Sequence, residues 1–68
     1  MEQKIELGKR VQIINHDASG KEFVEGTAVI RSIISNDGDR AYCAVVFDGD
    51  YYNAKRRFER WVRREVKK

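Results

Sequence analysis

Apolar and polar residues are grouped along the chain in short stretches that predict extended strands. The most apolar stretch, residues 41–47, carries no charge and is rich in branched and aromatic side chains, which favour an extended backbone. It is too short for a typical helix, and turns made of Asn, Asp and Gly flank it on both sides. We therefore predict that residues 41–48 form the central strand of a small antiparallel sheet.

An earlier stretch predicts the first strand. In residues 10–15, Val11 and Ile13 alternate with polar residues, as in a strand with one buried face. The Asn, Asp, Ser and Gly residues that follow indicate a polar loop. We expect Phe23 and Val24, near the end of this loop, to fold back over one end of the core.

The stretch between them, residues 27–35, predicts a further strand. Its apolar run is interrupted at Arg31 and Ser32, which predicts a bend or bulge near its middle. A bent strand in so small a domain can serve two faces of a barrel. Residues 36–39, Asn-Asp-Gly-Asp, predict a hairpin turn into the central strand, because Asp and Gly tolerate a positive φ.

The last segment, residues 51–66, fits two patterns. As a helix it has one apolar stripe, with arginines on the other faces and no Gly or Pro within it. The stripe comprises Tyr51, Ala54, Phe58, Trp61, Val62 and Val66. If the segment is a strand, Phe58 and Val62 lie on one face of it, but Arg60 lies on that face too. Taken alone, this pattern favours a helix.

Four short sequences follow one another in an order that resembles a small SH3-like barrel: GKRV at 8–11, EGTAVI at 25–30, AVVFD at 44–48 and ERWV at 59–62. KOW and Tudor-type modules and the small peripheral SH3-like subunit of photosystem I have this layout. The resemblance covers about residues 8–66 and implies a mainly β chain, an antiparallel barrel of about five strands.

The resemblance also implies a fourth strand at residues 58–62 and a turn at 63–66 that leads into a closing strand. In such barrels the glycine that opens the second strand, here Gly26, allows close backbone approach. The alternative is a three-stranded antiparallel sheet with a C-terminal helix. It stays open because the chain lacks the Gly or Pro that often separates the last elements of these barrels.

Length and composition predict one small domain, residues 1–68, with flexible residues 1–7. Cys43 is the single cysteine and lies in an apolar stretch, so we expect a buried thiol in a reducing, cytoplasmic setting. No apolar stretch is long enough to span a membrane, and the first residues have no apolar block typical of a signal peptide.

Charge is unevenly distributed along the chain, whose net charge is +3. Residues 1–54 carry six basic and nine acidic side chains, whereas residues 55–68 carry eight basic and two acidic ones. A mildly acidic body with a basic C-terminal segment indicates a polyanionic partner.

We predict that arginine forks in the basic segment bind the phosphate backbone of a nucleic acid with little sequence selectivity. Trp61 is expected in the core, with only its indole N–H reaching a partner. The predicted binding residues are Arg56, Arg57, Arg60, Arg63, Arg64 and Lys67, joined by Lys9 and Arg10 if the first strand neighbours the last. The alternative interpretation is a solvated face that pairs with the acidic body.

Catalytic chemistry is not indicated. His16 and Cys43 are the only residues of their kinds and provide neither a nucleophile–base pair nor a set of metal ligands, so no catalytic residue, metal or cofactor is expected. Turn formation explains the Asp-Gly-Asp sequences at 37–39 and 48–50. Tyr42 and Phe47 fall on opposite faces of the same predicted strand, which argues against a Tudor-like aromatic cage that uses both.

The sequence thus predicts a non-enzymatic binding module that engages nucleic acid through its basic C-terminal segment. The rival hypothesis is a protein–protein adaptor or inhibitor that docks on an acidic protein surface, since SH3-like barrels serve both roles. The small size suggests an accessory protein encoded by a phage or plasmid.

Overall fold

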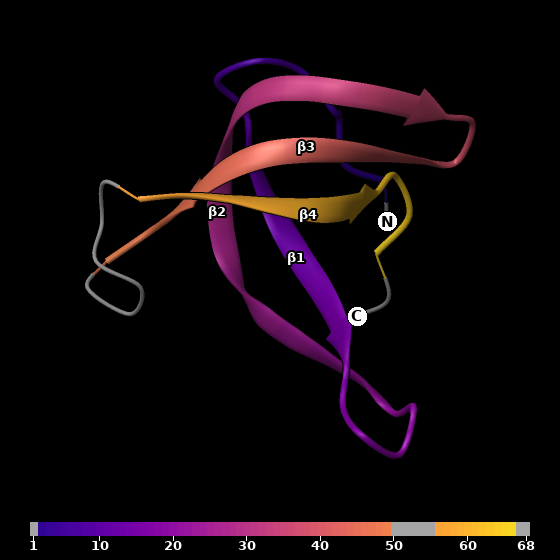
Figure 1. Ribbon diagram of the computed structural model, residues 1–68. Coiled ribbons are helices and arrows are strands. Elements are labelled where there is room, and N and C mark those ends of the chain that lie inside the picture. The colour runs from indigo at the N-terminus through magenta and orange to yellow at the C-terminus, as the bar shows by residue number, and fades with distance from the viewer. Residues whose placement is uncertain (1, 50–55, 67–68) are drawn as a thin grey trace.

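In residues 2–49 and 56–66, which this computed structural model describes, the chain forms one antiparallel sheet of four strands (Figure 1). The strands are β1 (Arg10–His16), β2 (Glu22–Asp37), β3 (Arg40–Phe47) and β4 (Arg57–Arg63). Each strand pairs with the next along the chain, so the sheet order is β1-β2-β3-β4. The described residues contain no helix, and the predicted mainly β class is confirmed.

The long second strand bends and so serves both of its neighbours. Its first half pairs with β1 and its second half with β3, and the register with β3 shifts at Arg31 and again at Ile34. Such bulges bend a strand and increase its twist. The predicted interruption at Arg31 is therefore confirmed, and Figure 1 shows the sheet curling so that β4 crosses in front of β1.

The predicted hairpin at residues 36–39 is also confirmed. Asp37 pairs with Arg40, which leaves a two-residue loop between β2 and β3. Gly38 in this loop has a φ of +71°, a conformation that a residue with a Cβ adopts only at a cost.

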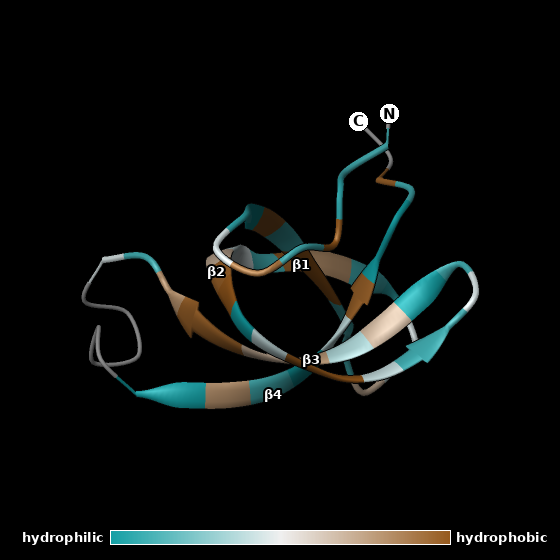
Figure 2. Ribbon diagram, turned by 90° about the horizontal axis from the view of Figure 1, so that it is seen from above, coloured by the Kyte–Doolittle hydropathy of each residue, from teal (hydrophilic) through white to brown (hydrophobic). Residues whose placement is uncertain are grey.

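The core lies on the concave face of the curled sheet. Alternate residues of β3 are buried while those between them are half-buried or exposed. Figure 2 shows the end of β3 as a continuous apolar stretch, so the alternation is one of burial and not of hydropathy. Gly26 leaves room for the Phe47 ring, because a Cβ on this glycine would lie 3.3 Å from it. The core comprises Ile5, Val11, Ile13, Ala28, Ile30, Ala41, Cys43, Val45, Phe47 and Val62.

The N-terminal segment links the two edge strands through Gln3. Its side-chain Nε2 donates to the carbonyl of Gln12 in β1 at 3.1 Å and to that of Arg63 in β4 at 2.8 Å. Its Oε1 accepts from the Gln12 N–H at 2.9 Å, and its own N–H donates to the Arg64 carbonyl at 2.7 Å. One amide side chain therefore bridges the gap between β1 and β4.

The alternative of a C-terminal helix is wrong for the described residues, because 57–63 form a strand, as the SH3-like resemblance implies for 58–62. β4 pairs with β3 along its whole length and turns Phe58 and Val62 toward the core. Ladder hydrogen bonds and burial thus override the helical pattern. The part of that expectation that concerns residues 51–55 lies outside the described residues.

The expected count of about five strands is also wrong for the described residues. β4 ends at Arg63, and beyond it Glu65 forms a single isolated bridge to Glu2 in place of a closing strand. The expected lid is wrong as well. Phe23 and Val24 belong to β2, are 45% and 52% exposed, and lie beyond the end of the core.

Candidate nucleic-acid interface

One row of residues crosses all four strands on the convex face of the sheet. The register pairs Arg10 with Val29, Val29 with Val46, and Val46 with Arg57. Side chains of directly paired residues lie about 5 Å apart on the same face. Two arginines therefore bracket two half-buried valines, which form an apolar floor.

Arg31 lies beside this row, two residues after Val29 in β2 and at the first shift in the register with β3. Together with Val29, Val46, Asp48 and Arg57, it lines a shallow depression of about 500 Å³. We call Arg10, Arg31, Arg57 and the two valines the basic end.

Only one arginine of the basic end is neutralised within the described part of the chain. Arg10 forms an ion pair with Asp48, with Nε 2.9 Å from Oδ2, and both side chains are exposed. Arg31 and Arg57 form no ion pair with any carboxylate of residues 2–49 and 56–66. As far as the described residues go, these two guanidinium groups are open to an anion.

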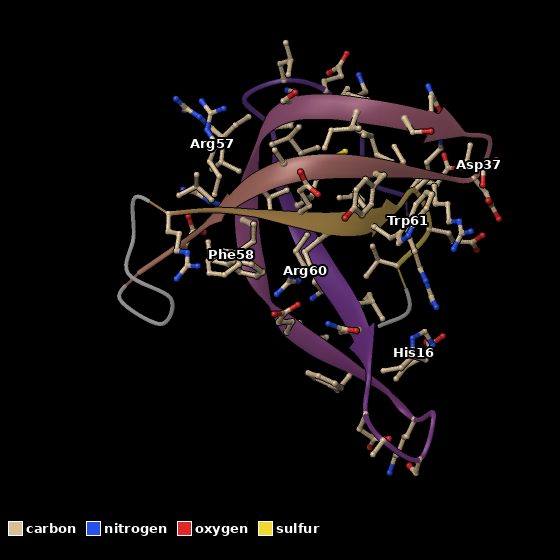
Figure 3. All side chains as sticks on the ribbon, viewed as in Figure 1. His16, Asp37, Arg57, Phe58, Arg60 and Trp61 are labelled. Atoms are coloured by element: carbon tan, nitrogen blue, oxygen red, sulfur yellow. The ribbon has the colours of Figure 1, made fainter. Side chains whose placement is uncertain are left out.

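An aromatic cluster lies at the opposite end of the same face, and Figure 3 shows Arg57 and Trp61 at the two ends of β4. Tyr42 pairs with Trp61 across the strands, and their ring centroids are 5.1 Å apart. The Arg40 guanidinium lies 4.0 Å from the centroid of the indole. We call these three residues the aromatic end.

A hydrogen bond fixes the tyrosine of the aromatic end. The Tyr42 hydroxyl donates to Glu59 Oε1 at 3.1 Å, and this bond raises the pKa of Tyr42. Trp61 is 39% exposed, so the expectation that it lies in the core is wrong. The alternation in β4 explains this, because Val62 occupies the core and its neighbour must point the other way.

Arg60, predicted as a phosphate ligand, is turned into the concave face instead. Its Nε lies 3.0 Å from Glu25 Oε1 and its Nη2 lies 3.1 Å from Oε2, an arrangement with both carboxylate oxygens engaged. The Glu25 side chain is only 5% exposed, and Asn15 Nδ2 donates to it at 3.2 Å. The guanidinium also lies 5.3 Å from the Phe58 ring centroid, as Figure 3 illustrates.

Two further predicted ligands are used within the chain. Arg63 pairs with Glu22, and this hydrogen bond raises the pKa of Arg63. Arg64 donates through Nε to the Gly38 carbonyl at 2.8 Å. The alternative interpretation, in which the basic segment pairs with the acidic body, thus describes Arg60 and Arg63.

The other predicted ligands lie near the basic end or outside the described residues. Arg56 is exposed, with its guanidinium 5.3 Å from the Phe58 ring centroid. Lys9 is exposed, and its backbone pairs with that of Ile30, next to Arg31. Lys67 lies outside the described residues.

Sequence reasoning missed Arg31 and the two valines of the floor. The signal was present, because a lone arginine breaks the apolar run of residues 27–35. The role of Arg31 is visible only in the fold, where it lines the same depression as Arg57, which is 26 positions later in the sequence.

Cys43 is buried as predicted, and burial raises the pKa of its thiol. Within the described ranges, no group of three His, Cys, Asp or Glu side chains is placed to hold a metal ion. Those ranges also contain no helix of the length and hydrophobicity that crossing a membrane requires. Comparison with known proteins gives no match, whether to a family model, to a curated protein or to a solved structure.

Proposed function

We propose that the chain is a non-enzymatic binding module that holds the phosphate backbone of a nucleic acid at its basic end. The observation that carries the proposal is the row from Arg10 to Arg57, with Arg31 beside it. Two of these three arginines lack a carboxylate partner among the described residues, and they flank an apolar floor. Planar guanidinium forks bind phosphate oxygens in pairs, and an apolar floor accepts the sugar between them.

The arrangement of the row suits a polymeric anion. Arg10, Arg31 and Arg57 belong to three different strands, with the two paired valines between Arg10 and Arg57. A single small anion engages one or two guanidinium groups, whereas successive phosphates of one strand can meet several. Each phosphate neutralised releases counterions, so affinity must fall as the salt concentration rises.

The same proposal places the chain among small SH3-like barrel modules. In support, β2 bends strongly at Arg31, the strands follow one another in the sheet, and Gln3 bridges the two edges. The buried Cys43 thiol supports a reducing, cytoplasmic setting.

The test is a binding titration with a fluorescently labelled oligonucleotide, followed by anisotropy at several salt concentrations. With three arginine–phosphate contacts, log K should fall with log salt at a slope of about −2 for a single strand or about −3 for a duplex. Arg31→Ala and Arg57→Ala should each reduce the steepness by about 0.7 to 0.9 and weaken unrelated sequences equally. The control is Lys21→Ala in the β1–β2 turn, which should leave the slope unchanged.

Absence of binding at low salt would overturn the proposal. It would favour the rival function, an adaptor or inhibitor that uses the same arginines against an acidic protein surface. In that case a protein partner should remain bound to immobilised wild-type chain after nuclease treatment, and Arg57→Ala should release it.

A further inference from the structure

We infer that the nucleic acid is single-stranded and that one unpaired base stacks at the aromatic end while its neighbouring phosphates lie at the basic end. This inference rests on the proposed function and extends it to the class of ligand. Two independent features of the convex face lead to it: an exposed indole held in place by its neighbours, and a segregation of charge along the strands.

The indole is exposed and oriented in advance of binding. Trp61 keeps 39% of its surface exposed although Tyr42 and Arg40 both contact its ring. The hydrogen bond from the Tyr42 hydroxyl to Glu59 restrains the tyrosine in turn. Aromatic rings and arginine guanidinium planes are the surfaces on which unpaired bases stack, and stacking tolerates any base because each has a π face.

The basic and aromatic ends lie on one continuous face at a fixed separation. Arg57 and Trp61 are four residues apart in β4, and Val46 and Tyr42 are four apart in β3, so about 13 Å separates the two ends. The residue between them on β3 is Ala44, whose short side chain leaves a low path over the sheet.

Charge gives this path a direction. Glu59, opposite Ala44, places a carboxylate next to Trp61, and a second depression of about 730 Å³ beside it has three acidic and two basic side chains in its lining: Asp37, Asp39, Glu65, Arg40 and Arg63. Carboxylates repel phosphates, so the phosphates belong at the basic end and a neutral base belongs at the aromatic end. A duplex cannot satisfy this arrangement, because its bases are already stacked and unstacking one costs a few kcal/mol.

Trp61 is the single tryptophan of the chain, so its fluorescence reports directly on the aromatic end. An oligothymidylate strand should quench this fluorescence as it binds, and the same strand annealed to oligoadenylate should not. Trp61→Ala should weaken binding of the single strand by about 5- to 150-fold, the value of one stacked base, and leave duplex binding unchanged. Trp61→Phe should retain most of the affinity, since it keeps an aromatic ring.

The matched control is Phe23→Ala, which removes an aromatic ring of similar exposure from the β1–β2 hairpin and should change neither affinity. Thermal unfolding of each variant checks that it folds, which is expected because both side chains lie outside the core.

The inference is overturned if Trp61→Ala binds single strand and duplex as tightly as the wild type does and if neither ligand quenches the wild-type fluorescence. The proposed function would then still stand. If neither nucleic acid binds, the proposed function itself fails and the inference fails with it.

Discussion

Replacing Arg60 with methionine should destabilise the domain strongly, because it removes two guanidinium hydrogen bonds from a buried carboxylate. Methionine keeps most of the aliphatic contact with Phe58 and removes only the charge and its hydrogen bonds. Glu25, with 5% of its side chain exposed, then loses both guanidinium contacts, at 3.0 and 3.1 Å. Asn15 would remain as a donor at 3.2 Å.

The magnitude follows from the burial of the two partners. Removing one member of a buried ion pair costs about 3–5 kcal/mol, since the other charge loses that partner. The Arg60 side chain is 28% exposed, so water can reach part of the vacated space and lower this cost. We expect a loss of about 2–4 kcal/mol, from a total stability that for a chain of this length is about 3–10 kcal/mol.

Urea denaturation of Arg60→Met, Glu25→Gln and the double variant measures this coupling. The double variant should lose less than the sum of the single losses, because the neutral amide that replaces the Glu25 carboxylate no longer needs the guanidinium charge of Arg60. Arg56→Met is the matched control: Arg56 is exposed and its guanidinium also lies near Phe58, and its replacement should change stability by less than about 0.5 kcal/mol. A loss at position 60 as small as that of the control, or strictly additive losses, would refute the reasoning.

Three further outcomes are expected. Phe47→Ala should cost about 3–5 kcal/mol in urea denaturation, since Phe47 is 3% exposed; an unchanged midpoint would contradict its place in the core. The buried Cys43 thiol, whose pKa is raised, should react slowly with a thiol reagent in buffer and rapidly in urea; equal rates would argue against burial. The hydrogen bond from the Ser19 hydroxyl, together with bonds from backbone N–H groups, lowers the pKa of Asp17. The stabilising contribution of the ionised Asp17 carboxylate is therefore present above about pH 4 and is lost on acidification. Thermal unfolding of Asp17→Asn should therefore depend less on pH below that value than the wild type does, and an identical pH dependence would count against this origin.

Strands with one buried face could be predicted from the sequence because their alternation is local. The central strand, predicted at 41–48, is found as β3 at Arg40–Phe47, and the first, predicted at 10–15, is found as β1 at Arg10–His16. β4 could not be decided in this way. Its inward positions include Arg60, whose partner Glu25 is 35 residues away and becomes visible only when the strands are paired.

The candidate site was predicted only in part, for a related reason. The basic segment looks like one continuous patch in sequence, but a strand sends successive side chains to opposite faces. Arg57 thus reaches the convex face while Arg60 enters the concave one. Composition gives the number of arginines, whereas pairing decides which of them remain available to a ligand, and it adds Arg31 from another strand.

The bridge made by Gln3 has a consequence for the order in which the domain folds. Each pair of neighbouring strands is joined by a short connection or by residues 48–56, so these pairs can form early with little loss of chain entropy. The hydrogen bond from Gln3 to Arg63 instead joins residues 60 positions apart, close to the full length of the chain. Contacts of such long sequence separation form late, so Gln3→Ala should accelerate unfolding and leave the refolding rate almost unchanged. The first few residues would then govern how long the native state persists, while the hairpins govern how fast it is reached.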